Sequence, residues 1–155
     1  EKPGLYCIVG PNGVGKSTMV KCINKLLKPT TGQVLIDGRD IKEMRFNEIA
    51  EHIGYVPVAS DDVFSMPVMD AILLGRKTGN KWRRTSDDIA MAYRVMRMMR
   101  VQDLAMKGFK ELSAGQHQKV SIARGLVQEP KMLILDEPTA NLDVKHQVYV
   151  AGEWP

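Results

Sequence analysis

The glycine-rich segment Gly10–Ser17, here called the phosphate loop, constrains this chain more than any other feature. It reads Gly-Pro-Asn-Gly-Val-Gly-Lys-Ser and matches the pattern G-x-x-x-x-G-K-[ST]. It follows a short apolar run, Leu5–Val9, that predicts a buried strand, and it precedes Ser17–Leu27, whose apolar residues have helical spacing. Glycines let the backbone amides turn inward, and these amides form a concave anion site with the helix N-terminus. The pattern therefore predicts nucleotide binding rather than a chance glycine-rich turn.

The residue types in the phosphate loop have distinct expected roles. Lys16 supplies a positive charge to the β- and γ-phosphates of the nucleotide, and Ser17 offers a hydroxyl to Mg²⁺. The nucleotide-contacting residues that we predict are Gly10, Pro11, Asn12, Gly13, Val14, Gly15, Lys16, Ser17 and Thr18.

A second signal is an apolar segment that ends in two acids. Met132–Leu135 predicts a buried strand, and Asp136 and Glu137 follow it directly. Parallel sheets bind ligands at the carboxyl ends of their strands. We therefore predict that Asp136 holds Mg²⁺ and that Glu137 is catalytic, because it can orient or deprotonate the attacking water. The alternative is a strand that ends in two solvated acids.

The remaining segments alternate between strand and helix patterns. Strands are expected at Gln33–Ile36 and Ile53–Val56. Helices are expected at Arg45–His52, Val68–Leu74 and Gly115–Gln128. A further helix is expected after an N-cap at Ser86, with its apolar positions at Ile89, Tyr93, Met96 and Met99. This alternation predicts the α/β class with a parallel sheet. Residues 61–128 carry no strand signal, so we expect a helical insertion within one domain of residues 1–155.

Composition excludes several other classes of protein. With 155 residues and 44% hydrophobic content, the chain can bury a core and is not disordered throughout. The net charge of +4 permits an anionic ligand without indicating nucleic acid, which we do not expect as a partner. Cys7 and Cys22 are too few for a disulfide framework, and both are expected in the core. No segment approaches the roughly 20 apolar residues of a membrane span.

Two further motifs connect the chain to a known family. Leu112–Gln116 reads Leu-Ser-Ala-Gly-Gln, and Ala140–Asp143 follows the acidic pair. With the phosphate loop, these make residues 4–149 resemble the ATP-binding subunit of an ABC transporter, whose signature is L-S-G-G-Q and whose D-loop is similar to Ala140–Asp143. The resemblance implies a P-loop NTPase fold, with a parallel sheet core and a helical insertion subdomain. Val63–Arg76 is similar to the subgroup of iron-siderophore, haem and vitamin B12 importers.

The resemblance also implies a mechanism. Two copies pair head to tail, and Ser113, Gly115 and Gln116 of one copy face the ATP of the other, while Asp143 adds to the nucleotide site. Hydrolysis of Mg-ATP then powers import through an integral membrane permease, from a peripheral position on the cytoplasmic face of the membrane. Ser113 has a simpler alternative role as a helix cap.

The chain departs from the family pattern at three places. Val58 stands where the family has a glutamine, and the valine side chain has no hydrogen-bond donor or acceptor. Ser60 or Asp61 would have to supply the polar group in place of that glutamine. The family's strands before Gly4 and after Asp143 have no counterpart, and His146 is too close to Asp136 to be the family's γ-phosphate histidine. We therefore expect an incomplete domain that lacks edge strands and is prone to self-association. The alternatives are a nucleotide-binding core fragment without turnover and a soluble ABC ATPase outside transport.

Two surface features remain open. The methionines of the expected insertion fill its core or form an adaptable surface for a membrane partner; they are Met91, Met96, Met98, Met99 and Met106. The basic segment Lys81–Arg84 is a solvated loop, or a contact for anionic lipid or for the membrane partner.

Overall fold

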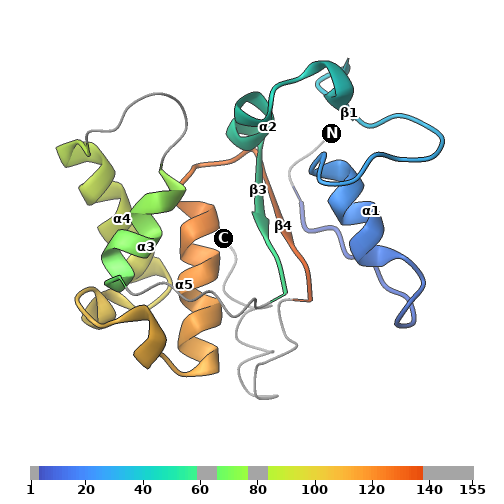
Figure 1. Cartoon of the computed structure of the whole chain (residues 1–155). Helices are drawn as coiled ribbons and strands as arrows, with labels where there is room; N and C mark the ends of the chain where they lie inside the picture. Colours follow the sequence, from blue (N-terminus) through green and yellow to red (C-terminus); the bar gives the residue numbers. More distant parts are fainter. Residues whose placement is uncertain (1–3, 59–65, 77–83, 138–155) are drawn as a thin grey trace. The chain divides into compact units, whose positions relative to one another are not determined.

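The computed structural model describes residues 4–58, 66–76 and 84–137 (Figure 1). The chain divides into two compact units, residues 1–46 and 47–155. The first contains α1 (Lys16–Ile23), β1 (Leu35–Ile36), β2 (Arg39–Asp40) and the short 3-10 helix η1 (Ile41–Glu43). The second contains α2 (Phe46–His52), β3 (Ile53–Val56), α3 (Val68–Gly75), α4 (Ser86–Met98), η2 (Gln102–Leu104), η3 (Phe109–Glu111), α5 (Ala114–Leu126) and β4 (Met132–Leu135). The first residue of α2, Phe46, is the last residue of the first unit.

Helix α1 forms where the sequence predicts it but ends earlier than Leu27. The side-chain amide of Asn24 donates to the carbonyl of Val20 at 2.9 Å, and the next residue, Lys25, has φ 58°. A left-handed residue at this position stops a helix. The helix therefore ends at Ile23.

Strand β1 occupies the second half of the expected strand Gln33–Ile36. It pairs antiparallel with β2, and Ile36 faces Arg39 across the turn. Asp37 and Gly38 have φ 50° and 84°. Two left-handed residues make the hairpin turn that matches the twist of paired strands, and Asp-Gly favours it.

The prediction of a buried strand at Leu5–Val9 is wrong. No strand forms there, and Leu5 and Val9 are 75% and 91% exposed. A buried strand needs a neighbouring strand and a covering layer. Within the described part of this unit the only strands, β1 and β2, pair with each other, so the apolar run has no strand to join. Cys7 is exposed for the same reason, and Cys22 is only half-buried, so neither cysteine is in a core.

The second unit is built on the parallel pair β3 and β4, in which Ile53 pairs with Met132 and Val56 with Leu135. The described helices α3, α4 and α5 lie between them in sequence, and α5 packs against β3 (Figure 1). Strand β3 is largely buried, as expected. Strand β4 is only half-buried, since β3 is its single partner among the described residues.

The core of this unit lies among the helices α3, α4 and α5. Its fully buried members include Val68, Ile72, Ala92, Met96, Phe109, Val120, Ala123 and Val127. Met91 and Met99 pack against them, which confirms the core-filling interpretation for these two and for Met96. Met98 and Met106 are exposed instead.

Helix α4 begins one residue earlier than predicted, because Thr85 and not Ser86 is the N-cap. The Thr85 hydroxyl accepts from the Asp88 amide, and the Asp88 carboxylate accepts from the Thr85 amide at 2.9 Å, which completes a capping box. The buried face of α4 also differs from the prediction. Ala92, Val95 and Met96 are buried, whereas Ile89 and Tyr93 are 44% and 49% exposed.

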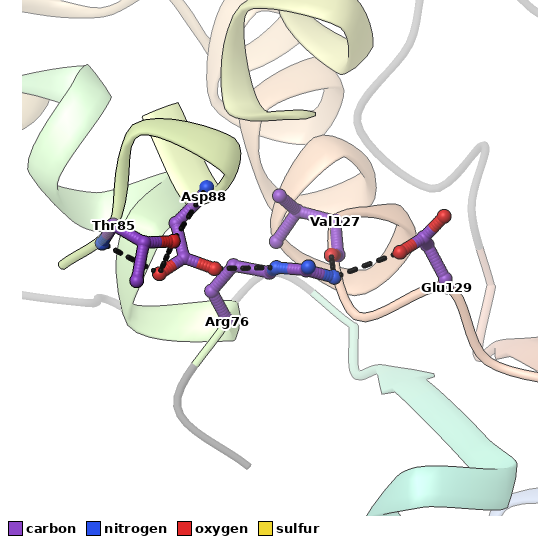
Figure 2. A network of polar contacts seen from close by, with 5 residues as sticks. All are labelled: Arg76, Thr85, Asp88, Val127 and Glu129. Carbon is purple, nitrogen blue, oxygen red and sulfur yellow. Dashed lines mark hydrogen bonds and ion pairs between the residues drawn. The ribbon is translucent and has the colours of Figure 1, made fainter. Parts of the chain in front are cut away.

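Arg76 joins three helices at one end of this core (Figure 2). Its Nε lies 2.9 Å from Asp88 in the first turn of α4, and its Nη1 lies 2.9 Å from Glu129 beyond α5. The same Nη1 donates to the carbonyl of Val127 at 3.2 Å. The guanidinium therefore ties the C-terminal end of α3 to the start of α4 and the end of α5.

This network makes the stability of the unit pH-dependent. The pKa of Asp88 is lowered, mainly by the Thr85 amide and then by the Arg76 guanidinium. A lowered folded-state pKa contributes stability above the unfolded pKa, about 3.9, and this contribution is lost as pH falls through the lower folded value. Asp88→Asn should cost about 1 kcal/mol at pH 7 and flatten the loss of stability below about pH 4. Urea unfolding at a series of pH values from 7 to below 4 measures both the loss of stability at pH 7 and the flattened pH profile.

The matched control is Asp87→Asn, which removes an exposed carboxylate from the same helical turn. It should keep the wild-type pH profile. An unchanged profile in Asp88→Asn would show that the network contributes nothing to acid stability.

Candidate functional site

The phosphate loop is shaped by two left-handed glycines. Gly13 and Gly15 have φ 81° and 101°, and Gly15 is the N-cap of α1. Side chains other than glycine rarely adopt these angles, so the pattern of glycines is needed for the backbone path. The loop thus leads directly into a helix N-terminus, where unpaired amides favour an anion.

The charge at this position is positive. The Nζ of Lys16 donates to the carbonyl oxygens of Gly10 and Pro11 at 2.8 and 3.0 Å. The ammonium is therefore held against the loop itself. The first turn of α1 contains no acidic residue that would offset it. This combination suits a phosphate group.

Ser17 and Thr18 follow Lys16 in the first turn of α1, half-buried and exposed respectively. Their hydroxyl oxygens are hard ligands of the kind that Mg²⁺ accepts. Among the described residues, no group of three or more His, Cys, Asp or Glu could hold a metal ion. A Mg²⁺ site with one hydroxyl, one carboxylate and substrate phosphates does not require such a group.

Asp136 lies at the carboxyl end of β4 and is only 7% exposed. Its amide donates to the carbonyl of Val56 at 2.9 Å and continues the ladder between the two strands. The Tyr55 hydroxyl donates to Oδ2 of Asp136 at 3.4 Å. Burial raises the pKa of Tyr55, and the Asp136 charge and this hydrogen bond raise it further. The phenol is therefore protonated and a donor at neutral pH.

Glu137 is exposed and has φ 47°. A left-handed backbone is uncommon for a residue with a side chain, and such conformations concentrate at functional sites. The two acids thus have different surroundings. Asp136 is buried and hydrogen-bonded, which suits a fixed ligand, whereas Glu137 is open to water.

The segment Leu112–Gln116, here called the signature segment, forms the start of α5. Ser113 is its N-cap: its hydroxyl accepts from the Gln116 amide at 3.3 Å, and its own amide donates to Oε1 of Gln116 at 3.0 Å. The helix-cap role of Ser113 is therefore confirmed. Ser113 remains exposed, and Gly115 and Gln116 are half-buried in the first turn. Cap and surface contact are thus compatible.

Val58 is 37% exposed and lies just beyond β3. Because Val56 pairs with Leu135, Val58 follows the strand at the same edge as Asp136. Its side chain adds no polar atom there.

The predicted site residues are divided between the two units. The phosphate loop and Thr18 belong to the first, and Asp136, Glu137 and the signature segment belong to the second. Ser60, Asp61, Lys81–Arg83, Asp143 and His146 lie outside the described residues. Arg84 is described and forms an ion pair with Asp70 at 2.6 Å.

Comparison with known proteins identifies the family. The family model described as ABC transporter matches residues 2–140. The chain belongs to the ABC transporter ATP-binding family. It is 50% identical over 146 residues to an uncharacterized ABC transporter ATP-binding protein of Methanocaldococcus jannaschii, covering 94% of this chain and 57% of the relative. It is 39% identical to a phosphonates import ATP-binding protein of Nitratidesulfovibrio vulgaris, covering 92% and 57%.

A cobalamin import ATP-binding protein of Halobacterium salinarum is 38% identical and is matched over 36% of its length. This chain thus spans at most a little over half of these relatives. Among solved structures, CbiO1 of Clostridium perfringens, part of the CbiONQ transporter complex, superposes with a TM-score of 0.80 at 35% identity, covering 94% of this chain and 58% of that one.

These matches confirm the P-loop NTPase fold. They do not single out iron-siderophore importers, since the relatives include phosphonate and cobalamin importers. No helix in the described part of the chain has the length and apolar character needed to cross a membrane.

Sequence analysis did not find two contacts, those of Tyr55 and Arg76. The Tyr55 contact follows from strand register, which places residues far apart in sequence side by side. The Arg76 network has one local signal, since Asp88 stands three residues after Thr85 in the capping-box spacing.

Proposed function

We propose that this chain binds ATP at the phosphate loop and hydrolyses it with Mg²⁺ to drive import through an integral membrane permease. The observation that carries the proposal is the loop itself. Left-handed Gly13 and Gly15 lead into α1, and Lys16 is held against the loop carbonyls. The names of the relatives support import as the process that hydrolysis drives.

We assign Ser17 and Asp136 as the two magnesium ligands, because both side chains offer the oxygen atoms that this ion prefers. Bound Mg²⁺ would neutralise developing charge on the phosphate oxygens. Lys16 and the loop amides bind the β- and γ-phosphates. Glu137, exposed to solvent, positions or activates the attacking water.

The proposed active form is a head-to-tail dimer. Exposed Ser113, with Gly115 and Gln116 at the start of α5, contacts the ATP of the second copy, where the helix N-terminus favours the γ-phosphate. Asp143 adds to the same site. ATP then binds the closed pair better than the open pair, which is the requirement for a ligand-driven switch. Assembly with the permease places the chain on the cytoplasmic face of the membrane.

A metal chelate is the substrate class that we propose. The resemblance of Val63–Arg76 to the siderophore, haem and vitamin B12 subgroup supports it. The cobalamin relative supports it as well. An inward-facing transporter of metal-chelate type also superposes with a TM-score of 0.75 at 32% identity, covering 92% of this chain and 53% of that one.

Calorimetric titration of Mg-ATP tests the proposal. Lys16→Ala should weaken binding about 100-fold, since it removes the charge at the phosphates. The matched control is Lys21→Ala, an exposed lysine in the last turn of the same helix, which should bind as the wild type does. Absence of binding in the wild type, or equal binding in Lys16→Ala, would contradict the proposal.

A further inference from the structure

The Tyr55 hydroxyl reaches the carboxylate that we assign to the metal. The two residues stand 81 positions apart in the chain and meet only because β3 and β4 pair in parallel. Tyr55 pairs with Ile134, so the hydroxyl reaches Asp136 two residues further along the neighbouring strand. Figure 1 shows the two strands side by side.

The backbone of Asp136 is fixed, so the orientation of its carboxylate depends on the groups that contact the side chain. The residue is 7% exposed, and its backbone is fixed by the bond to Val56. The terminal torsion of an aspartate side chain has broad wells. A donor on one oxygen therefore helps to set the orientation of the Asp136 carboxylate. Groups that orient a metal ligand in this way commonly change metal affinity tenfold or more.

We propose that Tyr55 is a positioning residue for Asp136, whose hydroxyl holds the carboxylate in the orientation in which it binds Mg²⁺. The inference rests on the proposed function, because it concerns the metal of the same site. In this role the hydroxyl contacts the carboxylate and not the metal or the nucleotide. The hydroxyl orients the carboxylate before the metal binds, so that less conformational entropy is lost on binding.

The contact is longer than a strong O–H···O bond, which spans about 2.7 Å. It therefore constrains the carboxylate without replacing the metal as its main partner. For this reason we expect an effect at the lower end of the range for such groups, about tenfold.

The test compares nucleotide binding with and without Mg²⁺. Adenylyl imidodiphosphate, which is not hydrolysed, is titrated by calorimetry in excess Mg²⁺ and again in EDTA. The dissociation constant in EDTA divided by that in Mg²⁺ measures how much the metal contributes to nucleotide binding. Tyr55→Phe should reduce this ratio about tenfold and leave the dissociation constant in EDTA unchanged.

Three controls isolate the hydroxyl. Tyr93→Phe removes the same group from the exposed surface of α4 and should keep the wild-type ratio. Asp136→Asn should reduce the ratio by itself. Adding Tyr55→Phe to Asp136→Asn should reduce it no further, because the hydroxyl acts through that carboxylate.

The outcomes separate the two proposals. Without nucleotide binding in the wild type, the proposed function and this inference both fail. If the wild type binds and Tyr55→Phe shows the same ratio, only the inference is overturned. It is also overturned if Tyr55→Phe weakens binding equally with and without Mg²⁺, or loses its fold by circular dichroism, because the hydroxyl would then support the fold rather than the metal site.

Discussion

Gly75→Ala is expected to lower the free energy of unfolding of the helical unit by about 3 kcal/mol or more. A Cβ on this last residue of α3 would overlap the backbone carbonyl of Arg124 in α5 and lie 2.8 Å from Cγ1 of Val127. A side chain could turn away from such a contact, but a helix carbonyl cannot. The methyl group would therefore have to push α3 away from α5 and open the core between them.

Urea unfolding followed by circular dichroism measures the effect. Gly4→Ala is the control, because the atoms nearest to a Cβ there belong to the Tyr6 side chain and lie 3.8 Å away or more. It should change the free energy of unfolding by less than about 0.5 kcal/mol. A Gly75→Ala variant as stable as this control would show that the two helices do not need their close approach.

Glu137→Gln is expected to slow ATP hydrolysis about 10³-fold and to leave ATP binding intact. The amide keeps the size of the side chain and removes its capacity to accept a proton. The exposed position of Glu137 beside buried Asp136 supports the assignment of the water to Glu137 and of the metal to Asp136. Phosphate release and calorimetric binding of Mg-ATP, measured on the same preparation, separate the two steps.

The control is Glu51→Gln, which changes an exposed glutamate of α2. It should hydrolyse ATP at the wild-type rate. Undiminished hydrolysis in Glu137→Gln would refute the role of Glu137. A wild-type chain that binds ATP without hydrolysing it would instead be a binding module, consistent with the absence of a polar group at Val58.

The elements that sequence predicted well are those with local signals. Asp37-Gly38 supplies the two left-handed residues of a hairpin turn, and Ile53–Val56 is a short apolar run that does find a strand partner. Leu5–Val9 has the same apolar pattern but lacks such a partner among the described residues of its unit. Periodicity reports which side chains favour burial, and it cannot report whether a neighbouring strand is present.

In the candidate site as well, features with local signals could be predicted and contacts between distant residues could not. The phosphate loop could be predicted because Gly13 and Gly15 each allow an unusual angle of their own backbone, which depends on no distant residue. The Tyr55 contact could not, because it depends on the register of two distant strands. The predicted and observed starts of α4 differ by one residue because Thr85 and Ser86 both carry a hydroxyl, and only the spacing to Asp88 distinguishes them.

The parallel pairing of β3 and β4 also bears on how the chain folds. The paired residues of the two strands, such as Ile53 and Met132, are 79 positions apart, so their pairing closes a long loop. Such closure is entropically costly and slow unless the intervening chain has already become compact. The helices α3, α4 and α5 pack on one another across shorter sequence separations than the strand pairing, so their contacts can form first. During synthesis on the ribosome, β3 therefore emerges before its partner, and the edge that β4 will cover stays open to aggregation until β4 has been made.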